Sequence, residues 1–470
     1  MAKKRKKAAD PAARVVAACE DAGVELIRFL YVDHGGVVRG KATSRARLTE
    51  RLRTGIGLVT GMQAMSMLDE LAPVTGLGPV GEIRLVPDPD SFVVLPYAPG
   101  AAAMMADMVQ LDGQPWEACP RAFLERAIAE LAGEGYALVA AFEPEFTLGR
   151  RVPGDGPDEP DRLVPVDQSL CFSTSGFGAA HDYAVELVRA LQAQGLVVEQ
   201  YYPELGHGQQ ELSVRHTPAL RAADNMVWYR ETARGVAWRQ GLWASLAPKP
   251  IGDQAGNGTH LHASLWEAGP DGRPGDRNVL YDGGDPRGLS ALAYHWIGGL
   301  LAHLPALVAL TCGSVNSYRR LAPQAWSSAF VCWGMDNREA AVRVPSRMWG
   351  LDEASTNLEL KPSDATGNPY LALGAVIHAG LDGIRNKLDP GRPVDTDPAT
   401  LSRATRRRRG IERLPSSLGE ALDALEADEL LMEALGPLRR DAYLAVKRSE
   451  VASFGARDAA FECFHHFTKF

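Results

Sequence analysis

Two glutamates that could bind a cation stand close together in one short apolar segment, Phe142-Glu143-Pro144-Glu145-Phe146. In a strand, side chains two residues apart point to the same side, so Glu143 and Glu145 would project together. Two adjacent carboxylates in a buried sheet are costly unless a cation neutralises them. The segment therefore predicts part of a cation site, and the alternative is a half-exposed strand edge without a ligand.

Two further segments place polar side chains beside glycines. Glu204 and Glu211 flank a glycine- and amide-rich loop, a pattern that also fits a solvated loop. His260, His262 and Ser264 alternate along a predicted strand that follows Gly-Asn-Gly. Glycines at such a place let the backbone approach a phosphate. A histidine pair with a purely structural role is the alternative here.

Basic side chains form another group. Arg338 precedes a predicted apolar strand and Arg343 lies on it. Guanidinium groups there suit bidentate binding of carboxylate or phosphate. Arginines paired with structural carboxylates would give the same pattern. Further along, Asn357, Glu359 and Lys361 alternate on one strand face.

These segments together predict a site dominated by oxygen ligands, which suits Mg²⁺ or Mn²⁺ better than zinc. Its candidate ligands are one histidine and five glutamates, namely Glu143, Glu145, Glu204, Glu211 and Glu359. Two cations with nearby arginines are what phosphoryl transfer from ATP requires. The chain has neither a Walker loop nor a kinase signature, so its nucleotide site must be of another kind.

Composition describes the kind of chain that must position these residues. It has 470 residues, 46% hydrophobic and 23% charged, which excludes a collagen, a coiled coil and a disulfide miniprotein and allows two to three domains. A net charge of −8 argues against nonspecific nucleic-acid binding. Six scattered cysteines without CxxC spacing, and no signal peptide, predict a cytoplasmic protein. The apolar stretch 296–312 contains His303 and Pro305, and we expect no membrane span.

The elements divide into an N-terminal part rich in strands and a larger α+β part. Residues 1–11 are expected to form a disordered basic tail, and 12–112 a small domain containing a hairpin that turns at Asp33–Gly36. Residues 55–82 show no clear periodicity of apolar residues and are predicted to be a long loop. A turn cluster at 112–115 marks the predicted boundary. Residues 113–470 then hold strands and helices in separate runs.

Six motifs in this order resemble the glutamine synthetase family, and the likeness spans roughly residues 24–450. They are EPEF (143–146), two glutamates separated by six residues (204–211), GNGTHLHASLW (256–266), NSYRRLAP (316–323), NREAAVRVP (337–345) and NPYLALGAVIHAGLDGI (368–384). The hairpin DHGGVVRGK (33–41) resembles the family's N-terminal β-grasp domain. The resemblance implies an α+β protein whose large catalytic domain, of the glutamine synthetase and guanido kinase kind, has a curved antiparallel sheet with helices.

The resemblance also implies ligands for at least two Mg²⁺ or Mn²⁺ ions, with ATP as co-substrate. The first ion would be held by Glu145, Glu204 and Glu211, and the second, which bridges the ATP phosphates, by Glu143, His260 and Glu359. His262 and Ser264 match the family's nucleotide-contacting pair. Arg338 and Arg343 match the arginines that steady the transferred phosphoryl group, so Arg338, Arg343 and Glu145 are the predicted catalytic residues, and Arg338 also meets ATP.

The family reaction has two steps, phosphorylation of a γ-carboxylate by ATP and displacement of phosphate by an amine. Gly256 matches the backbone position that meets the amino-acid substrate, and Arg320 the arginine that holds its carboxylate. Lys361 replaces an arginine that binds the glutamate carboxylate in the family. A lysine ammonium can supply the positive charge, but it lacks the bidentate hydrogen bonding of a guanidinium. Family members usually assemble as double-ring dodecamers with sites shared between subunits, so we expect a homo-oligomer.

Two departures concern ammonia. Ammonia-using members carry an aspartate in an N-terminal loop, but the corresponding stretch 57–66 has no acidic residue. They also carry a flap glutamate where this chain has Trp326. An indole offers an apolar wall in place of an anion. We therefore hypothesise a ligase for glutamate and a non-ammonia amine; a true ammonia-dependent glutamine synthetase and a noncatalytic metal-binding paralogue are the alternatives.

One departure concerns regulation. The loop 391–413 lacks the tyrosine that adenylylated members carry and contains the arginine run 406–409 instead. We therefore predict no control by adenylylation.

Overall fold

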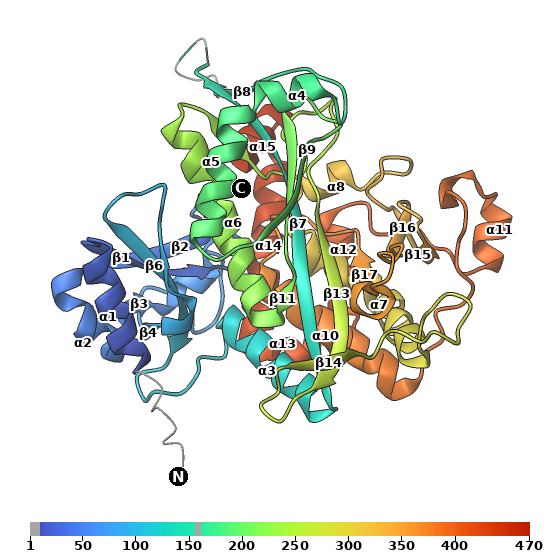
Figure 1. Cartoon of the computed structure of the whole chain (residues 1–470), viewed down its shortest axis with the longest axis horizontal. Helices are drawn as coiled ribbons and strands as arrows, with labels where there is room; N and C mark the ends of the chain where they lie inside the picture. The colour runs from blue at the N-terminus through green and yellow to red at the C-terminus, as the bar shows by residue number, and fades with distance from the viewer. Residues whose placement is uncertain (1–9, 155, 157–160) are drawn as a thin grey trace.

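The computed structural model describes residues 10–154, 156 and 161–470 (Figure 1). Residues 1–9 of the predicted basic tail lie outside this part. Residues 10 and 11 do not belong to a tail, because Pro11 begins helix α1 (Pro11–Asp21) and the Asp10 side chain accepts a hydrogen bond from the Ala12 amide. Proline is favoured at the first helical position because its missing N–H is not needed there.

The N-terminal domain is built on a six-stranded sheet, in which strands lie in the order β2-β1-β6-β4-β3 and β5 pairs with β6. Its strands are β1 (Leu26–Val32), β2 (Val38–Ser44), β3 (Ile56–Val59), β4 (Glu82–Pro87), β5 (Val93–Val94) and β6 (Ala101–Val109). Helix α2 (Leu48–Thr54) follows the β1–β2 hairpin. The predicted hairpin is confirmed, since Val32 pairs with Val38 across the turn.

Two predictions for this domain were wrong. The stretch 55–82 is not all loop, because it contains β3 and a 3₁₀ turn at Thr60–Ala64. Strand β6, Ala-Ala-Ala-Met-Met-Ala-Asp-Met-Val, was not foreseen, and it lies in the middle of the sheet beside β1 and β4. Alanine and methionine have little preference for strands, and burial on both faces removes the alternation that usually reveals one.

The C-terminal domain contains an eleven-stranded sheet with the order β15-β16-β17-β13-β7-β10-β9. Its strands are β7 (Tyr136–Val152), β8 (Arg162–Pro165), β9 (Val198–Pro203), β10 (Gln209–Val214), β11 (Thr217–Pro218), β12 (Trp243–Ser245), β13 (Thr259–Ala268), β14 (Pro274–Asn278), β15 (Phe330–Met335), β16 (Ala340–Val344) and β17 (Leu358–Leu360). The pairs are antiparallel, as predicted, except that β15 and β16 run parallel. The long strand β7 pairs with β8, β10, β11, β12 and β13 and forms the axis of the sheet.

Helices pack around this sheet. They are α3 (Pro120–Gly133), α4 (Thr174–Ala179), α5 (His181–Ala193), α6 (Ala219–Arg239), α7 (Ala291–Thr311), α8 (Ser317–Arg320), α9 (Asp352–Ser355), α10 (Pro369–Asn386), α11 (Arg403–Arg408), α12 (Leu418–Glu426), α13 (Glu429–Leu435), α14 (Pro437–Gly455) and α15 (Ala459–Lys469). Helices α12 and α13 are separate, because Asp428 caps the second one by accepting from the Leu431 amide. Helix α15 was not predicted.

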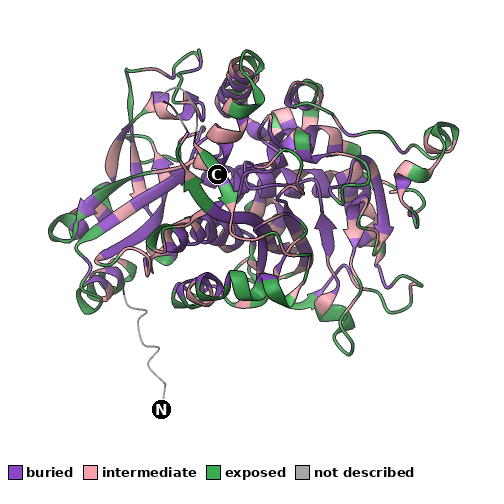
Figure 2. Ribbon diagram, turned by 90° about the horizontal axis from the view of Figure 1, so that it is seen from above, coloured by how far each residue is buried: buried purple, intermediate pink, exposed green. Residues whose placement is uncertain are grey.

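The sheet has an apolar face and a polar face. From β7, Phe142 and Phe146 enter the main hydrophobic core, where the Phe146 ring meets Tyr183 of α5 and Tyr229 of α6 edge-on. Buried residues concentrate between sheet and helices in Figure 2. Because side chains alternate along a strand, Glu143 and Glu145 point to the opposite face.

Helix α7 is long and apolar enough to cross a membrane by length and composition, with a mean hydropathy of 1.3. It packs against α10, and the two backbones approach so closely that a Cβ at Gly299 or Gly383 would collide with the facing backbone. Helix α7 is thus packed tightly against another helix of the same domain.

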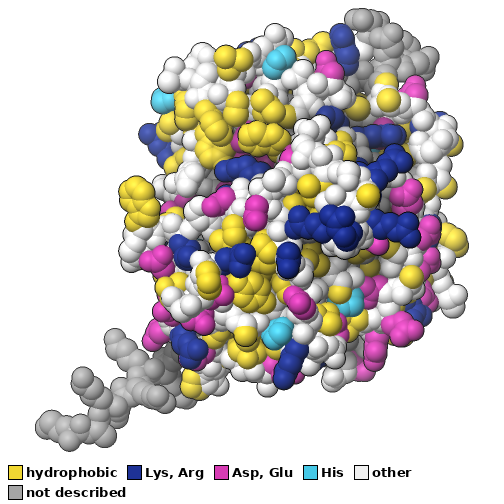
Figure 3. Space-filling model, turned by 90° about the vertical axis from the view of Figure 1, so that its right-hand side faces the viewer, with side chains coloured by type: hydrophobic (Ala, Val, Ile, Leu, Met, Phe, Trp, Pro, Cys, Tyr) yellow, Lys and Arg dark blue, Asp and Glu magenta, His cyan; other side chains and the backbone are white. Residues whose placement is uncertain are grey.

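Helix α11 and the residues after it carry the arginines that the sequence places at 406–409. Basic side chains gather on the side of the molecule that carries this helix (Figure 3). The Arg406 guanidinium lies 5.0 Å from the centre of the Phe330 ring and donates to three carbonyls, so at least this member of the run has a structural role.

Candidate active site

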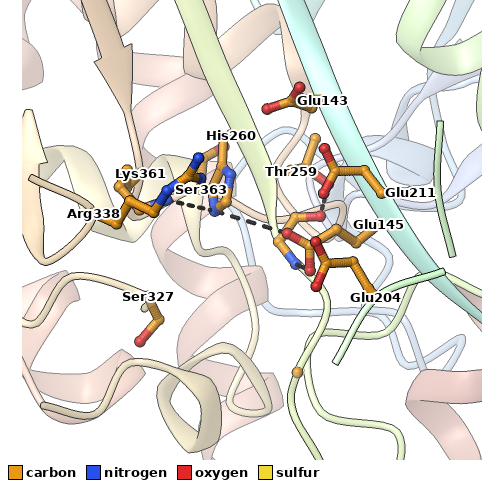
Figure 4. A network of polar contacts seen from close by, with 12 residues as sticks. Glu143, Glu145, Glu204, Glu211, Thr259, His260, Ser327, Arg338, Lys361 and Ser363 are labelled. Atoms are coloured by element: carbon orange, nitrogen blue, oxygen red, sulfur yellow. Dashed lines mark hydrogen bonds and ion pairs between the residues drawn. The ribbon is translucent and has the colours of Figure 1, made fainter. Parts of the chain in front are cut away.

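The register of the sheet aligns the predicted site residues in a row. Glu143 pairs with His260, and Glu145 pairs with Glu211 on the other side of β7. His262 pairs with Glu359, which in turn pairs with Arg343. Neighbouring strands lie about 4.8 Å apart, so side chains at paired positions are close together on one face. Figure 4 shows the glutamates, His260 and Lys361 converging on one space.

Glu145 is held at the centre of this row. One carboxylate oxygen, Oε2, accepts from the Gly258 amide at 2.9 Å and from the Gln209 side-chain amide at 2.7 Å. The Gln209 amide also donates to the Gly256 carbonyl at 3.0 Å, and Gln209 is buried. These contacts fix one oxygen of Glu145 and leave Oε1 directed toward His260, 3.9 Å away.

The structure brings the second set of predicted metal ligands together with a different histidine. Glu143, His262 and Glu359 offer ligand atoms that all lie within 4.8 Å of one another, whereas the prediction named His260. His262 Nε2 lies 3.3 Å from Glu143, and His260 Nδ1 lies 3.3 Å from Glu359. Both histidines therefore contact this set, and the sequence alternation could not distinguish them because both face the same side.

His260 lies between acidic and basic groups. Its Nε2 accepts from Arg320 Nη2 at 3.0 Å and lies 3.4 Å from Lys361 Nζ. Lys361 also contacts Glu359 at 3.3 Å and is buried. Burial, reinforced by Lys361, holds the pKa of His260 well below its usual value. This ring therefore stays neutral, the protonation state in which an imidazole binds a metal.

Three carboxylates on the β7–β10 side, those of Glu145, Glu204 and Glu211, lack cationic partners strong enough to offset their burial, whereas His262 lowers the pKa of Glu143 despite burial. Burial raises the pKa of Glu145 to about 7, and burial together with Glu143 and Glu145 raises the pKa of Glu211 to about 11. Burial also raises the pKa of Glu204. An ion of charge +2 would relieve this repulsion, and the donor set of carboxylates and imidazole fits Mg²⁺ or Mn²⁺.

On the β16–β17 side, Glu359 has the opposite surroundings. Burial opposes its ionisation, but Lys361 and then His262 outweigh burial and lower the pKa of the carboxyl group. Arg343 Nη1 donates to Glu359 at 2.8 Å, while Arg343 Nε is buried without a hydrogen-bond partner among the residues that the structure describes. Arg343 thus keeps a donor available for an anion.

Two glycines allow the strands and loops to approach the site. A Cβ at Gly256 would collide with the Pro248 carbonyl and would lie 3.1 Å from the Arg320 side chain. A Cβ at Gly258 would collide with Arg320 and would lie 2.8 Å from His260 Nε2 and 3.0 Å from Glu145 Oε1. The Gly-Asn-Gly motif therefore lets backbone occupy space directly beside the candidate ligands.

The remaining predicted residues surround this centre at different depths. Arg320 is buried and donates to the Ser363 carbonyl at 3.3 Å, whereas Arg338 is exposed and makes no hydrogen bond to another described residue through its side chain. Ser264 is buried and accepts from the Trp266 indole at 3.0 Å. Arg338 lies near Glu204, since its charge lowers the pKa of that carboxyl group.

Trp326 lies in the segment 323–328 between α8 and β15, with 64% of its surface exposed. Gln324, Trp326 and Ser328 all have positive φ angles, between 57° and 62°, which are unusual for residues with side chains. The Trp326 amide donates to Glu339 Oε1 at 2.7 Å, and Ser328 donates to the Ala340 carbonyl at 3.0 Å. Polar contacts from the crossover between β15 and β16 thus hold this segment.

Sequence reasoning missed two residues that shape the site. Gln209 orients Glu145, and its signal was the amide-rich run Gln209-Gln210 before Glu211. Glu339 supports the Trp326 segment, and the only signal was an acidic residue directly after Arg338. Neither role follows from residue type, because both depend on contacts between segments far apart in the chain.

Two family models match this chain over nearly its whole length. The family model described as glutamine synthetase N-terminal domain matches residues 11–116, and that of the glutamine synthetase catalytic domain matches residues 117–465.

Full-length relatives include enzymes with different named products. The gamma-glutamylpolyamine synthetase GlnA3 of Streptomyces coelicolor is 38% identical, covering 93% of this chain and 91% of its own. A glutamine synthetase of Pyrococcus furiosus is 36% identical, covering 90% and 88%, and the glutamate–methylamine ligase of Methyloversatilis universalis is 36% identical, covering 78% and 80%.

Solved structures match over nearly the whole chain. The crystal structure of a novel glutamine synthase homolog has a TM-score of 0.82 at 36% identity, covering 95% of this chain and 99% of its own. A GmaS/ADP complex has a TM-score of 0.81 at 30% identity, covering 95% and 98%. Both family models and these relatives place the chain among ATP-dependent ligases that join glutamate to ammonia or an amine, and the protein belongs to the glutamine synthetase family.

Proposed function

We propose that this protein forms a γ-glutamyl amide from glutamate and an amine other than ammonia, through a γ-glutamyl-phosphate intermediate. In the first step a γ-carboxylate oxygen takes the terminal phosphoryl group of ATP and ADP leaves. In the second, the amine nitrogen attacks the acyl carbon, phosphate leaves and the nitrogen loses a proton. The products are the amide, ADP and phosphate.

The observation that carries the choice of amine is the exposed indole of Trp326 at the position where the resemblance expects a flap glutamate. An ammonium ion needs anions around it, whereas an indole supports the carbon skeleton of a larger amine. Two relatives, named as a γ-glutamylpolyamine synthetase and a glutamate–methylamine ligase, are consistent with such a substrate.

We assign the cation sites to the two groups of carboxylates. Glu145, Glu204 and Glu211 would hold one Mg²⁺ or Mn²⁺ ion, and Glu143 and Glu359 would hold another with His260 or His262. When bound, the ions offset negative charge on the triphosphate and on the group being transferred. The chain's own contribution is to fix the ligands, as Gly258 and Gln209 do for Glu145.

Basic residues and the nucleotide pair complete the assignment. Arg343 offers its free Nε, and Arg338 its exposed guanidinium, to the phosphoryl group in transit. Arg320 and Lys361, beside Gly256, would bind the carboxylates of the acid substrate. His262 and Ser264 would contact the nucleotide. Guanidinium groups already held by Glu359 or by backbone carbonyls lose little freedom on binding, which favours precise orientation of substrate.

The test is phosphate release by the full chain with glutamate, ATP and Mg²⁺ across a panel of amines that includes ammonium. We expect the highest kcat/KM with an alkyl, hydroxyalkyl or aromatic amine, and mass spectrometry should detect the corresponding γ-glutamyl amide. Highest activity with ammonium would refute the proposal and would make the protein a glutamine synthetase, like the Pyrococcus furiosus relative of that name.

A further inference from the structure

A cavity of about 320 Å³ adjoins the Trp326 segment. It lies between that segment, the crossover from β15 to β16, and residues 395–397 of the following loop. Its walls carry the indole of Trp326 and four carboxylates, Asp336, Glu339, Asp395 and Asp397, against one basic residue, Arg338. A cavity of this size is at the lower end of the range for small-molecule sites, and its charge favours a cation.

The two carboxylate oxygens of Glu339 differ in their contacts. Oε1 accepts from the Trp326 amide at 2.7 Å. Oε2 is buried and has no hydrogen-bond partner among the residues that the structure describes. Burial raises the pKa of this carboxyl group. A buried acceptor left unpaired is costly, so an ammonium group donating to Oε2 would remove that cost.

Trp326 forms the apolar wall of the same cavity. Since 64% of its surface is exposed, an aliphatic chain can lie against the indole, and a cation can lie over its face. The acidic wall is joined to this segment, because Gln324 donates to Asp397 at 3.0 Å while Glu339 holds the Trp326 amide. The indole and the carboxylates are therefore positioned relative to each other before any ligand binds.

The cavity adjoins the candidate active site. Arg338 lines it and is also one of the basic residues proposed to meet the transferred phosphoryl group. Lys361, which is proposed to bind the acid substrate, acts electrostatically on Glu339, although burial leaves the pKa of Glu339 raised. A molecule bound in the cavity would therefore lie close to the groups that activate the acid substrate.

We infer that this cavity binds the distal cationic nitrogen of a diamine or polyamine, with Glu339 as the principal carboxylate and Trp326 against the carbon chain. The inference rests on the proposed function and narrows its amine to one with at least two nitrogens. A monoamine has only one ammonium group, which the acyl-transfer step consumes, so it would leave Glu339 and Asp395 without a cation, whereas Asp336 and Asp397 already accept hydrogen bonds from Ser346 and Ala399.

Binding to the full chain tests this assignment without turnover. Isothermal titration calorimetry should compare 1,4-diaminobutane with n-butylamine, which has the same carbon chain and lacks the second nitrogen. We expect the diamine to bind at least tenfold more tightly, and Glu339→Gln to remove the preference. The matched control is Glu267→Gln, an exposed acid on β13 outside the cavity, which should leave it unchanged.

A second variant guards against misfolding of the first. Asp395 makes no side-chain hydrogen bond among the described residues, so Asp395→Asn removes charge from the cavity without breaking a contact. We expect it to weaken diamine binding about threefold. In the kinetic assay, Glu339→Gln should raise KM for the diamine about tenfold with little change in kcat, and change KM for n-butylamine less than twofold.

The outcomes separate this inference from the proposed function. Equal binding of the two amines by the unmodified chain, or equal loss of both in Glu339→Gln, would overturn the cavity assignment whichever amine is turned over. Turnover with ammonium alone would instead overturn the proposed function. Tight diamine binding that depends on Glu339 would still support a polyamine site in that case.

Discussion

The carboxylate centre on β7, β10, β13 and β17 and the segment 323–328 contribute to one site in contrasting ways. The centre sits on paired strands, where Glu145 and Glu359 are buried and their neighbours are fixed by sheet register. The segment has no regular structure and has three residues with positive φ angles, and Trp326 is largely exposed. The proposed metal and phosphoryl chemistry thus lies on paired strands, whereas the proposed choice of amine lies on a loop, where substitutions disturb the fold least.

Removing Glu145 should have the largest effect. Glu145→Ala should lower turnover by at least about 10³-fold with every amine, because a ligand of the proposed first ion is lost. Phosphate release measures turnover, and circular dichroism should show an unchanged fold. Glu199→Ala, an exposed acid on β9 paired with Arg215, is the control. Near-normal turnover in Glu145→Ala would mean that the first ion binds elsewhere.

Arg338 tests whether the exposed edge of the site takes part in phosphoryl transfer. Arg338→Ala should lower kcat about 10³-fold if the guanidinium meets the transferring group. Arg277→Ala, which removes an exposed arginine paired with Glu267, provides the comparison. A loss below about fivefold would mean that Arg338 belongs to the amine cavity alone and not to the carboxylate centre.

Gly258→Ala tests the close approach of backbone to the centre. The added methyl group would collide with Arg320 and crowd His260, so we expect kcat/KM to fall about 10²-fold, since small displacements of reacting groups are that costly. Gly178→Ala, where a Cβ meets open space, should be neutral. Unchanged kinetics in Gly258→Ala would show that Arg320 moves freely and that the centre is less rigid than the strand pairing indicates.

The smallest effect should come from Trp326, and it should depend on the amine. Trp326→Ala should lower kcat/KM for a preferred amine about tenfold through lost apolar contact, with less than a twofold change for ammonium. The control is Trp349→Ala, which removes a fully exposed indole from the loop between β16 and α9. An equal loss for ammonium and for larger amines would contradict the contrast between a general centre and a selective loop.

Which candidate site residues share one face of the sheet could largely be predicted, because side chains alternate between the two faces along each strand. Spacing alone put Glu143 with Glu145 and Glu359 with Lys361 on common faces. The choice between His260 and His262 could not be made in this way, since both lie on one face of β13 and only the paired strands separate their neighbours. The role of each residue in catalysis stays a prediction.

Other features escaped because their causes are not local. Strand β6 is stabilised by burial between β1 and β4. Its alanines and methionines have little preference for strands, so the residue types do not predict it. Glu339 became visible as a support of Trp326 only when the loop and the β15–β16 crossover were seen together. Assembly into a dodecamer and sharing of sites between subunits likewise stay predictions, because they concern surfaces that one chain cannot define.

Strand β7 has a consequence for how the protein loses activity under mild denaturing conditions. Since it is bonded to five other strands, the backbone amides of Glu143 and Glu145 can exchange with solvent deuterium only through the rarest, global opening events. The loop that carries Trp326 has no such protection. Selectivity among amines should therefore be lost first on gentle heating, while the capacity to hydrolyse or transfer phosphate survives until the whole domain unfolds.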